Sequence, residues 1–160
     1  MSVNPKPLID SNILIYAVDK ESLYHEESLS VFREYLQKGC YLADFSLIEF
    51  FQVITDGKKT PKPCSPEEAS QYIKHFINTP EIEVLELKIL NILNNPKLTD
   101  DLKRYDITRY GIYDYLIASC MRINGIGHIV TFNDKDFQKY EWLEPVNLKT
   151  HLTNQTNQTN

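Results

Sequence analysis

Apolar positions along this chain form short continuous runs separated by longer amphipathic segments. The short runs predict strands at 7–9, 40–43, 82–87, 128–131 and 146–148. Apolar residues at three- and four-residue steps predict helices at 13–18, 23–38, 47–55, 66–77, 87–93 and 112–123. Breaker residues predict a loop at 56–66, a break at 94–101 and a polar turn at 132–137. This order favours an α/β fold in which helices cover both faces of a parallel sheet.

The domain organisation follows from length and composition. The chain has 160 residues, enough for one core, and no repeat or linker divides it, so we expect one domain over residues 1–150. Residues 151–160 are repetitive and polar and are predicted to be a disordered tail. No apolar run could span a membrane and no signal peptide is visible, so we expect a cytoplasmic protein without membrane contact. Its three cysteines lack metal-type spacing and are expected to be free thiols.

The net charge of −5 bears on whether the protein binds nucleic acid. Domains that coat nucleic acid are usually strongly basic, so this charge argues against that role. It leaves room for an enzyme that binds nucleic acid briefly through bound cations, because acidic residues gathered in one cleft dominate the sum.

Asp10 is the first candidate for chemistry, because it directly follows the first predicted strand. In open α/β sheets, ligands bind at the carboxyl ends of the strands. The alternative is that Asp10 only caps the following helix, and Ser11 and Asn12 are also good capping residues.

Other acidic residues follow the remaining strands. Glu49 lies early in the helix after the second strand, although Ser46 and Glu49 also fit the capping-box pattern. Asp114 lies early in a strongly apolar helix, and Asp134 and Asp136 lie in the turn after the fourth strand. Carboxylates that converge at one sheet edge need protons or cations, and oxygen ligands favour Mg²⁺ or Mn²⁺. Such ions activate water and neutralise charge in phosphodiester hydrolysis, which would leave a 5′-phosphate.

Four motifs in this order resemble those of PIN domains. They are LIDSNIL at 8–14, SLIEF at 46–50, DYLIAS at 114–119 and TFNDKDF at 131–137, and together they cover nearly the whole fold. The most similar subgroup is the VapC-type toxin ribonucleases. The resemblance implies a three-layer α/β/α fold with a central parallel sheet of about five strands and a metal-dependent RNA hydrolysis site at its carboxyl edge.

The resemblance also implies roles for single residues. Asp10, Glu49 and Asp114 would be metal ligands, directly or through water, and Asp136 would complete the catalytic acids. The residue at the usual position of the fourth acid is Asn133, which departs from the pattern. Asp134 or Asp136 would then replace that acid, or Asn133 would hold a ligand water.

Polar neighbours of the acids would orient them. Ser11 and Thr131 would supply hydroxyl groups that orient carboxylates or waters, and Asn12 lies beside them.

The resemblance further implies an RNA substrate, a cognate antitoxin and a homodimer. Three alternatives remain open: a PIN nuclease without a toxin role, a non-catalytic PIN-like binding module, and a phosphohydrolase that forms an aspartyl phosphate. The last is disfavoured because Asn12 stands where such enzymes carry a second Asp.

Basic and aromatic residues give weaker predictions of RNA contact. Lys58, Lys59 and Lys62 lie in the predicted loop, and Arg104 and Arg109 lie beside tyrosines. Tyr113 and Tyr115 cannot share one helix face, so at least one is expected in the core. The four histidines are scattered singly.

Overall fold

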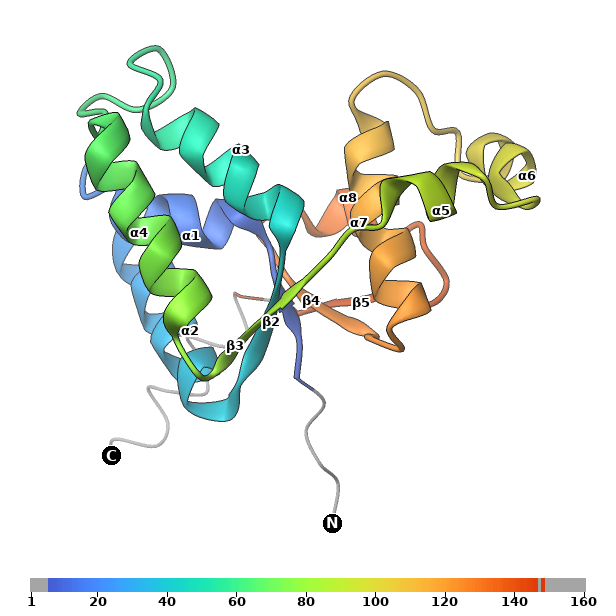
Figure 1. The fold of residues 1–160 in the computed structure, drawn as a ribbon, viewed down its shortest axis with the longest axis horizontal. Coiled ribbons are helices and arrows are strands. Elements are labelled where there is room, and N and C mark those ends of the chain that lie inside the picture. Colours follow the sequence, from blue (N-terminus) through green and yellow to red (C-terminus); the bar gives the residue numbers. More distant parts are fainter. Residues whose placement is uncertain (1–5, 147, 149–160) are drawn as a thin grey trace.

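A five-stranded sheet forms the centre of the computed structural model, which describes residues 6–146 and 148 (Figure 1). The strand order is β3-β2-β1-β4-β5, and all four neighbouring pairs are parallel. The strands are β1 Leu8–Ile9, β2 Cys40–Ala43, β3 Ile82–Leu85, β4 His128–Val130 and β5 Glu144–Val146. The predicted five-stranded parallel sheet is therefore confirmed.

Helices cover both faces of the sheet and make the fold a three-layer sandwich (Figure 1). On one face lie α1 Ser11–Val18, α2 His25–Lys38, α3 Asp44–Ile54 and α4 Pro66–Asn78. On the other side lie α5 Ile89–Leu93, α6 Leu98–Arg104, α7 Gly111–Ile123 and α8 Asp134–Phe137. None of the described helices is both long and apolar enough to cross a membrane. The α/β/α architecture predicted from the sequence is confirmed.

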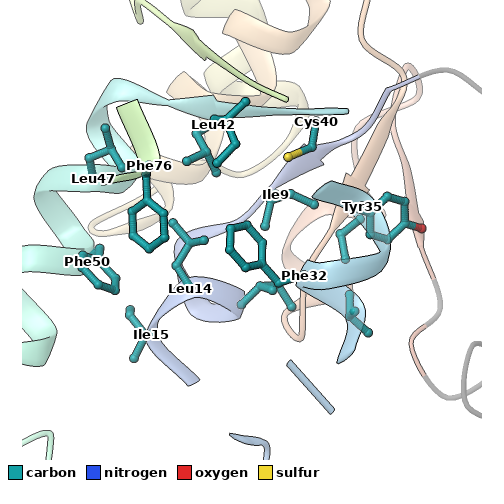
Figure 2. Close-up of a cluster of buried hydrophobic side chains, with 14 of the residues drawn as sticks. Ile9, Leu14, Ile15, Phe32, Tyr35, Cys40, Leu42, Leu47, Phe50 and Phe76 are labelled. Atoms are coloured by element: carbon teal, nitrogen blue, oxygen red, sulfur yellow. The ribbon is translucent and has the colours of Figure 1, made fainter. Parts of the chain in front are cut away.

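Each face of the sheet has its own hydrophobic core, because successive side chains of a strand point to opposite faces. Ile9 and Val130 face the core shared with α1–α4, and Leu8 and Ile129 face the core shared with α7. Figure 2 shows the first core, where Phe32, Phe50 and Phe76 pack around Leu14 and Leu42. Phe76 packs edge-on against both other rings, with centroids 5.8 Å from Phe32 and 5.3 Å from Phe50. Burying one such side chain stabilises the fold by about 1.5–3 kcal/mol.

The order of the strands places a topological switch point between β1 and β4. From β1 the chain continues to β2 and β3 on one side, then returns past β1 to β4 and β5 on the other. The pairs Leu8–Ile129 and Ile9–Val130 join the two strands. The Asp10 amide extends this ladder by donating a 3.0 Å hydrogen bond to the Val130 carbonyl. Open α/β sheets bind their ligands at such points.

Apart from small shifts at the ends of other elements, three sequence predictions about secondary structure were wrong. The predicted break at 94–101 contains the start of α6, because the breakers lie before Leu98 and both Leu98 and Leu102 pack on the second core. The predicted turn at 132–137 contains the short helix α8. The strand predicted at 146–148 begins at Glu144, since edge strands tolerate the proline at 145.

Two further sequence predictions concern the C-terminal segment and the cysteines. The predicted tail at 151–160 lies outside the described residues. The three cysteines are free, as predicted from their spacing.

Candidate active site

Asp10 lies at the carboxyl end of β1, buried with 6% of its surface exposed. It is also the N-cap of α1, because its Oδ1 accepts a 2.7 Å hydrogen bond from the Ser11 amide. The capping interpretation of Asp10 is therefore correct, and α1 begins at Ser11 rather than at residue 13. The cap uses mainly Oδ1. The other oxygen, Oδ2, accepts hydrogen bonds from Thr131 Oγ1 at 2.7 Å and Asn12 Nδ2 at 3.0 Å.

A polar network fixes the end of β4 against the end of β1. Asn12 Nδ2 also approaches Thr131 Oγ1 at 3.0 Å, and Asn12 Oδ1 accepts a 3.3 Å hydrogen bond from the Phe132 amide. Thr131 Oγ1 accepts a further bond of 2.9 Å from the Asn133 amide. Asn12 and Thr131 are both buried. Their hydrogen bonds therefore determine the direction in which the Asp10 carboxylate points.

Glu49 joins this group through Ser11. The Ser11 hydroxyl lies 2.5 Å from Glu49 Oε2 and 3.4 Å from Asp10 Oδ1. The alternative role of Glu49 in a capping box with Ser46 is wrong, because α3 begins at Asp44 and Ser46 lies inside it.

The early start of α3 has a cause in the structure. The Asp44 carboxylate accepts hydrogen bonds from the amides of Phe45, at 2.7 Å, and Leu87, at 3.2 Å. Asp44 therefore starts the helix and ties it to the segment that follows β3. Ser46 is consequently buried, and its hydroxyl has no partner among the described residues.

Asp114 is the fourth residue of α7 and is half-buried. Burial is the main cause that raises the pKa of its carboxyl from 3.8 to about 6, and the neighbouring charges of Asp136, Asp10 and Glu49 add to the effect. The positive charge of Lys139 acts in the opposite direction. Asp114 therefore lies in the same electrostatic environment as the other three acids.

The pKa of Asp10 is raised from 3.8 to about 6 as well, chiefly by burial and further by the charge of Glu49. The hydrogen bonds from Thr131 and Ser11 lower it and offset part of this rise. A carboxylate cluster of this kind is unfavourable when all its members are ionised, unless a cation compensates the charge.

The three candidates for the fourth acid lie in the segment after β4 and have different environments. Asp134 accepts hydrogen bonds from the Lys135 amide and from Gln138 Nε2, so its carboxylate is occupied within α8. Asn133 is exposed and is the N-cap residue of α8. Asp136 is exposed, and its charge acts directly on Asp114. Of the three candidates, Asp136 has the electrostatic link to the other acids.

The residues predicted to contact RNA differ in their exposure and in their partners in the structure. Tyr115 is buried, as predicted for at least one of the two tyrosines, and Tyr113 is 44% exposed and stacks on Phe45 with centroids 5.2 Å apart. Arg104 forms an ion pair with Glu141, and Lys62 forms one with Glu21. These two cations are therefore engaged on the protein surface.

Sequence analysis missed two residues near the acids. Lys139 follows α8, with its Nζ 5.5 Å from the centroid of the Tyr140 ring, and Tyr140 is fully buried beside Tyr115. No motif or spacing in the sequence sets Lys139 apart from the other lysines, or Tyr140 apart from the other nine tyrosines.

Comparison with protein families gives a match to the PIN domain over residues 8–143. The chain belongs to the PIN domain family. The match includes β1–β4 and every acid discussed above, in agreement with the four sequence motifs.

Solved structures with a similar fold include two from bacteria. VapBC2 from Rickettsia felis, bound to a DNA fragment from its promoter, is 19% identical, with a TM-score of 0.58 over 88% of this chain and 98% of that chain. VapC20 of Mycobacterium tuberculosis, a toxin that cleaves the sarcin–ricin loop, is 11% identical, with a TM-score of 0.62 over 82% of this chain and 93% of that chain. At these identities the likeness concerns the fold. Comparison with curated protein sequences gives no significant match.

The donor set of this PIN domain fits a hard divalent cation by its chemistry. Its members are carboxylate and hydroxyl oxygens, the ligands that Mg²⁺ and Mn²⁺ prefer. Burial and mutual repulsion raise the pKa of two of them, so a cation would relieve an existing electrostatic cost. Within the described part of the chain, however, no three Asp, Glu, His or Cys side chains are arranged to hold a metal ion as they stand.

Proposed function

We propose that this PIN domain is a divalent-metal-dependent endoribonuclease that hydrolyses RNA phosphodiester bonds. The observation that supports it most is the electrostatic coupling of Asp114 with Asp136, Asp10 and Glu49 at the switch point of the sheet. A bound Mg²⁺ or Mn²⁺ would lower the pKa of water and neutralise the charge that develops on the phosphate. Asp10, Glu49 and Asp114 would hold the cation, with Asp136 as the fourth acid. Their carboxylates would have to move closer together when the cation binds.

The protein's own groups would prepare the site in advance. Thr131 and Asn12 hold Asp10 Oδ2, and Ser11 holds Glu49, so two of the acids keep a fixed direction. Burial of Asp10 reduces competition from solvent for its oxygens. Preorganised ligands of this kind bind a cation without first losing side-chain freedom.

An RNA substrate is further supported by exposed aromatic rings on both sides of the acids. On one side, Tyr24 is 48% exposed and packs on Phe132, with ring centroids 4.9 Å apart. On the other side, Tyr113 stacks on Phe45 next to Asp114. Stacking on aromatic rings contributes about 1–3 kcal/mol per unpaired base, and this contribution comes from the ring face rather than from a charge. An acidic protein could therefore bind unpaired RNA.

The deciding experiment is cleavage of pooled RNA with Mn²⁺ or Mg²⁺, compared with EDTA and with an Asp10→Asn, Asp114→Asn double variant. We expect cleavage that leaves 5′-phosphate ends, stops with EDTA and is lost in the double variant. Asp100→Asn, which changes an exposed acid on α6, is the matched control and should cleave like the wild type. Absence of cleavage in a folded protein that binds metal would favour the non-catalytic binding module instead.

We further propose that the protein is the toxin of a type II toxin–antitoxin pair and forms a homodimer. The support is the shared fold with VapBC2 and VapC20. A groove of about 550 Å³ between α3 and α5 offers a surface for a partner, because exposed Ile48 and Leu90 line it beside Phe45.

One measurement tests the toxin role and another tests the homodimer. Induced expression of the wild type should arrest bacterial growth, whereas the double variant should not. A toxin role would be contradicted by normal growth at equal protein levels. Sedimentation of the purified protein tests the homodimer.

A further inference from the structure

A buried hydroxyl near the acidic edge has no partner. Tyr140 is fully buried, and its Oη forms no hydrogen bond within residues 6–146 and 148. A buried polar group without a partner costs roughly 1–3 kcal/mol, so such groups usually have a structural or functional explanation. The hydroxyls of Ser28 and Ser46 are also buried and without a hydrogen-bond partner among the described residues. The surroundings of Tyr140 distinguish it from Ser28, which lies on α2 against the other core.

The Tyr140 ring lies between α7 and α8, the two helices that carry Asp114 and Asp136. Its centroid is 6.3 Å from that of Tyr115, the residue after Asp114, and 6.4 Å from that of Phe137, the residue after Asp136. Burial, followed by the charge of Asp114 and then by smaller effects that include Asp136, raises the pKa of the Tyr140 phenol. A tyrosine hydroxyl carries its proton at neutral pH and is therefore available as a hydrogen-bond donor.

The acids of the site differ in their hydroxyl partners. Asp10 accepts a hydrogen bond from Thr131, and Glu49 accepts one from Ser11. The Asp114 carboxyl, in contrast, accepts no hydrogen bond from any of the residues that the structure describes. Asp114 is therefore the proposed ligand without a hydroxyl partner, and the unpartnered hydroxyl belongs to a ring packed between the helices that carry Asp114 and Asp136.

We propose that Tyr140 is the positioning residue for Asp114: its hydroxyl donates a hydrogen bond to the Asp114 carboxylate, directly or through one water, when a divalent cation binds. This inference rests on the proposed metal-dependent function. A carboxylate that gives one oxygen to a cation keeps the other for a donor, and such outer hydrogen bonds fix the ligand's direction. Each of the three metal-binding acids would then have one hydroxyl partner.

Lys139 is the competing partner for Asp114, because its positive charge lowers the pKa of that carboxyl. Its side chain is exposed, whereas the Tyr140 hydroxyl is fixed in the core. A fixed donor limits the orientation of a ligand, and a mobile cation mainly adjusts its charge. The two roles can be separated by substitution, since Lys139→Met removes the charge and Tyr140→Phe removes only one oxygen atom.

The experiment compares wild type, Tyr140→Phe, Lys139→Met and Ser28→Ala. Mn²⁺ affinity is measured by titration calorimetry and by the rise of the melting temperature with Mn²⁺ in the absence of RNA. We expect Tyr140→Phe to raise the Kd for Mn²⁺ about tenfold. Its metal-free melting temperature should be equal to or above that of the wild type, because an unpaired buried hydroxyl is removed. Cleavage should fall at low Mn²⁺ and recover when Mn²⁺ is saturating.

The controls make a negative result informative. Ser28→Ala removes another unpartnered buried hydroxyl and should leave the Kd for Mn²⁺ unchanged. In an Asp114→Asn background, Tyr140→Phe should have no further effect on the remaining Mn²⁺ affinity, because the hydroxyl acts through Asp114. Wild-type Mn²⁺ affinity in Tyr140→Phe would overturn the role of Tyr140 and leave the proposed function intact. Absence of Mn²⁺ binding in the wild type would overturn both.

Discussion

Replacing Asp114 by asparagine should stabilise the metal-free protein at neutral pH while removing the proposed nuclease activity. The carboxyl of Asp114 has a pKa of about 6 in the folded chain instead of 3.8, first because it is partly buried and then because Asp136 and Asp10 are negatively charged. The folded state therefore holds a proton that the unfolded state releases between about pH 4 and pH 6. Stability falls across this range as the pH rises, and the loss is complete above about pH 7.

The size of this effect follows from the difference between the two pKa values. Raising the pKa from 3.8 to about 6 corresponds to about 3 kcal/mol. Because Asp114 is only half-buried, solvent screening reduces this value, and we expect about 1–2 kcal/mol. Asparagine has nearly the same shape and no charge. Asp114→Asn should therefore match the wild type near pH 4 and exceed its free energy of unfolding by about 1–2 kcal/mol at pH 7.5.

Urea denaturation in EDTA can measure this difference through the fluorescence of Trp142, the single tryptophan of the chain. Glu83→Gln is the matched control, because it removes the same charge from an exposed position on β3. Saturating Mn²⁺ should reverse the order of stability, since only the wild type keeps all its metal-binding acids. The reasoning would be refuted if Asp114→Asn were equal to or less stable than the wild type at pH 7.5, or if the difference did not change between pH 4 and pH 7.5.

Two further predictions test the polar network and the fourth acid. Asn12→Ala leaves the Phe132 amide and Asp10 Oδ2 each without one partner, so the free energy of unfolding should fall by about 2 kcal/mol; a loss below about 0.5 kcal/mol in urea denaturation would contradict this role. Asp136→Asn should reduce RNA cleavage roughly tenfold or more, whereas Asp134→Asn, whose carboxylate is bound to Gln138, should cleave normally. Equal losses in both variants would show that the whole turn matters rather than one acid.

The sequence predicted the sheet and most of its helices because these depend on local patterns. Apolar runs and helical periodicity identify the elements, and the motif at 8–14 places Asp10 at the end of a strand. The two interpretations of Asp10, as helix cap and as site residue, are compatible, because one carboxylate oxygen serves each purpose. Capping and ligand binding at a strand end require the same residue at the same place.

The remaining features depend on contacts between distant residues. From the sequence alone, Glu49 is compatible with a capping box. In the structure α3 begins earlier, at Asp44, whose carboxylate accepts a hydrogen bond from the Leu87 amide, 43 residues away. Asp134 and Asp136 have the same side chain and nearly the same position in the sequence. The structure distinguishes them, because Asp134 accepts hydrogen bonds from Gln138 and the Lys135 amide, whereas the charge of Asp136 acts on Asp114. Tyr140 could not be selected among ten tyrosines, because its proposed role depends on a buried hydroxyl that has no partner in the described part of the chain.

The hydrogen bond from the Asp10 amide to the Val130 carbonyl extends the pairing of β1 with β4, and the register of this pair determines whether the site can form. β1 has only two residues, both fully buried, and each faces a different core. A shift of one residue against β4 would exchange Leu8 and Ile9 between the cores and turn Asp10 away from Thr131. A chain with this error would have no competent site, even if most of its helices had formed. The proposed nuclease would therefore become active only after the central strands have paired in register, and its specific activity would measure the fraction of correctly folded molecules.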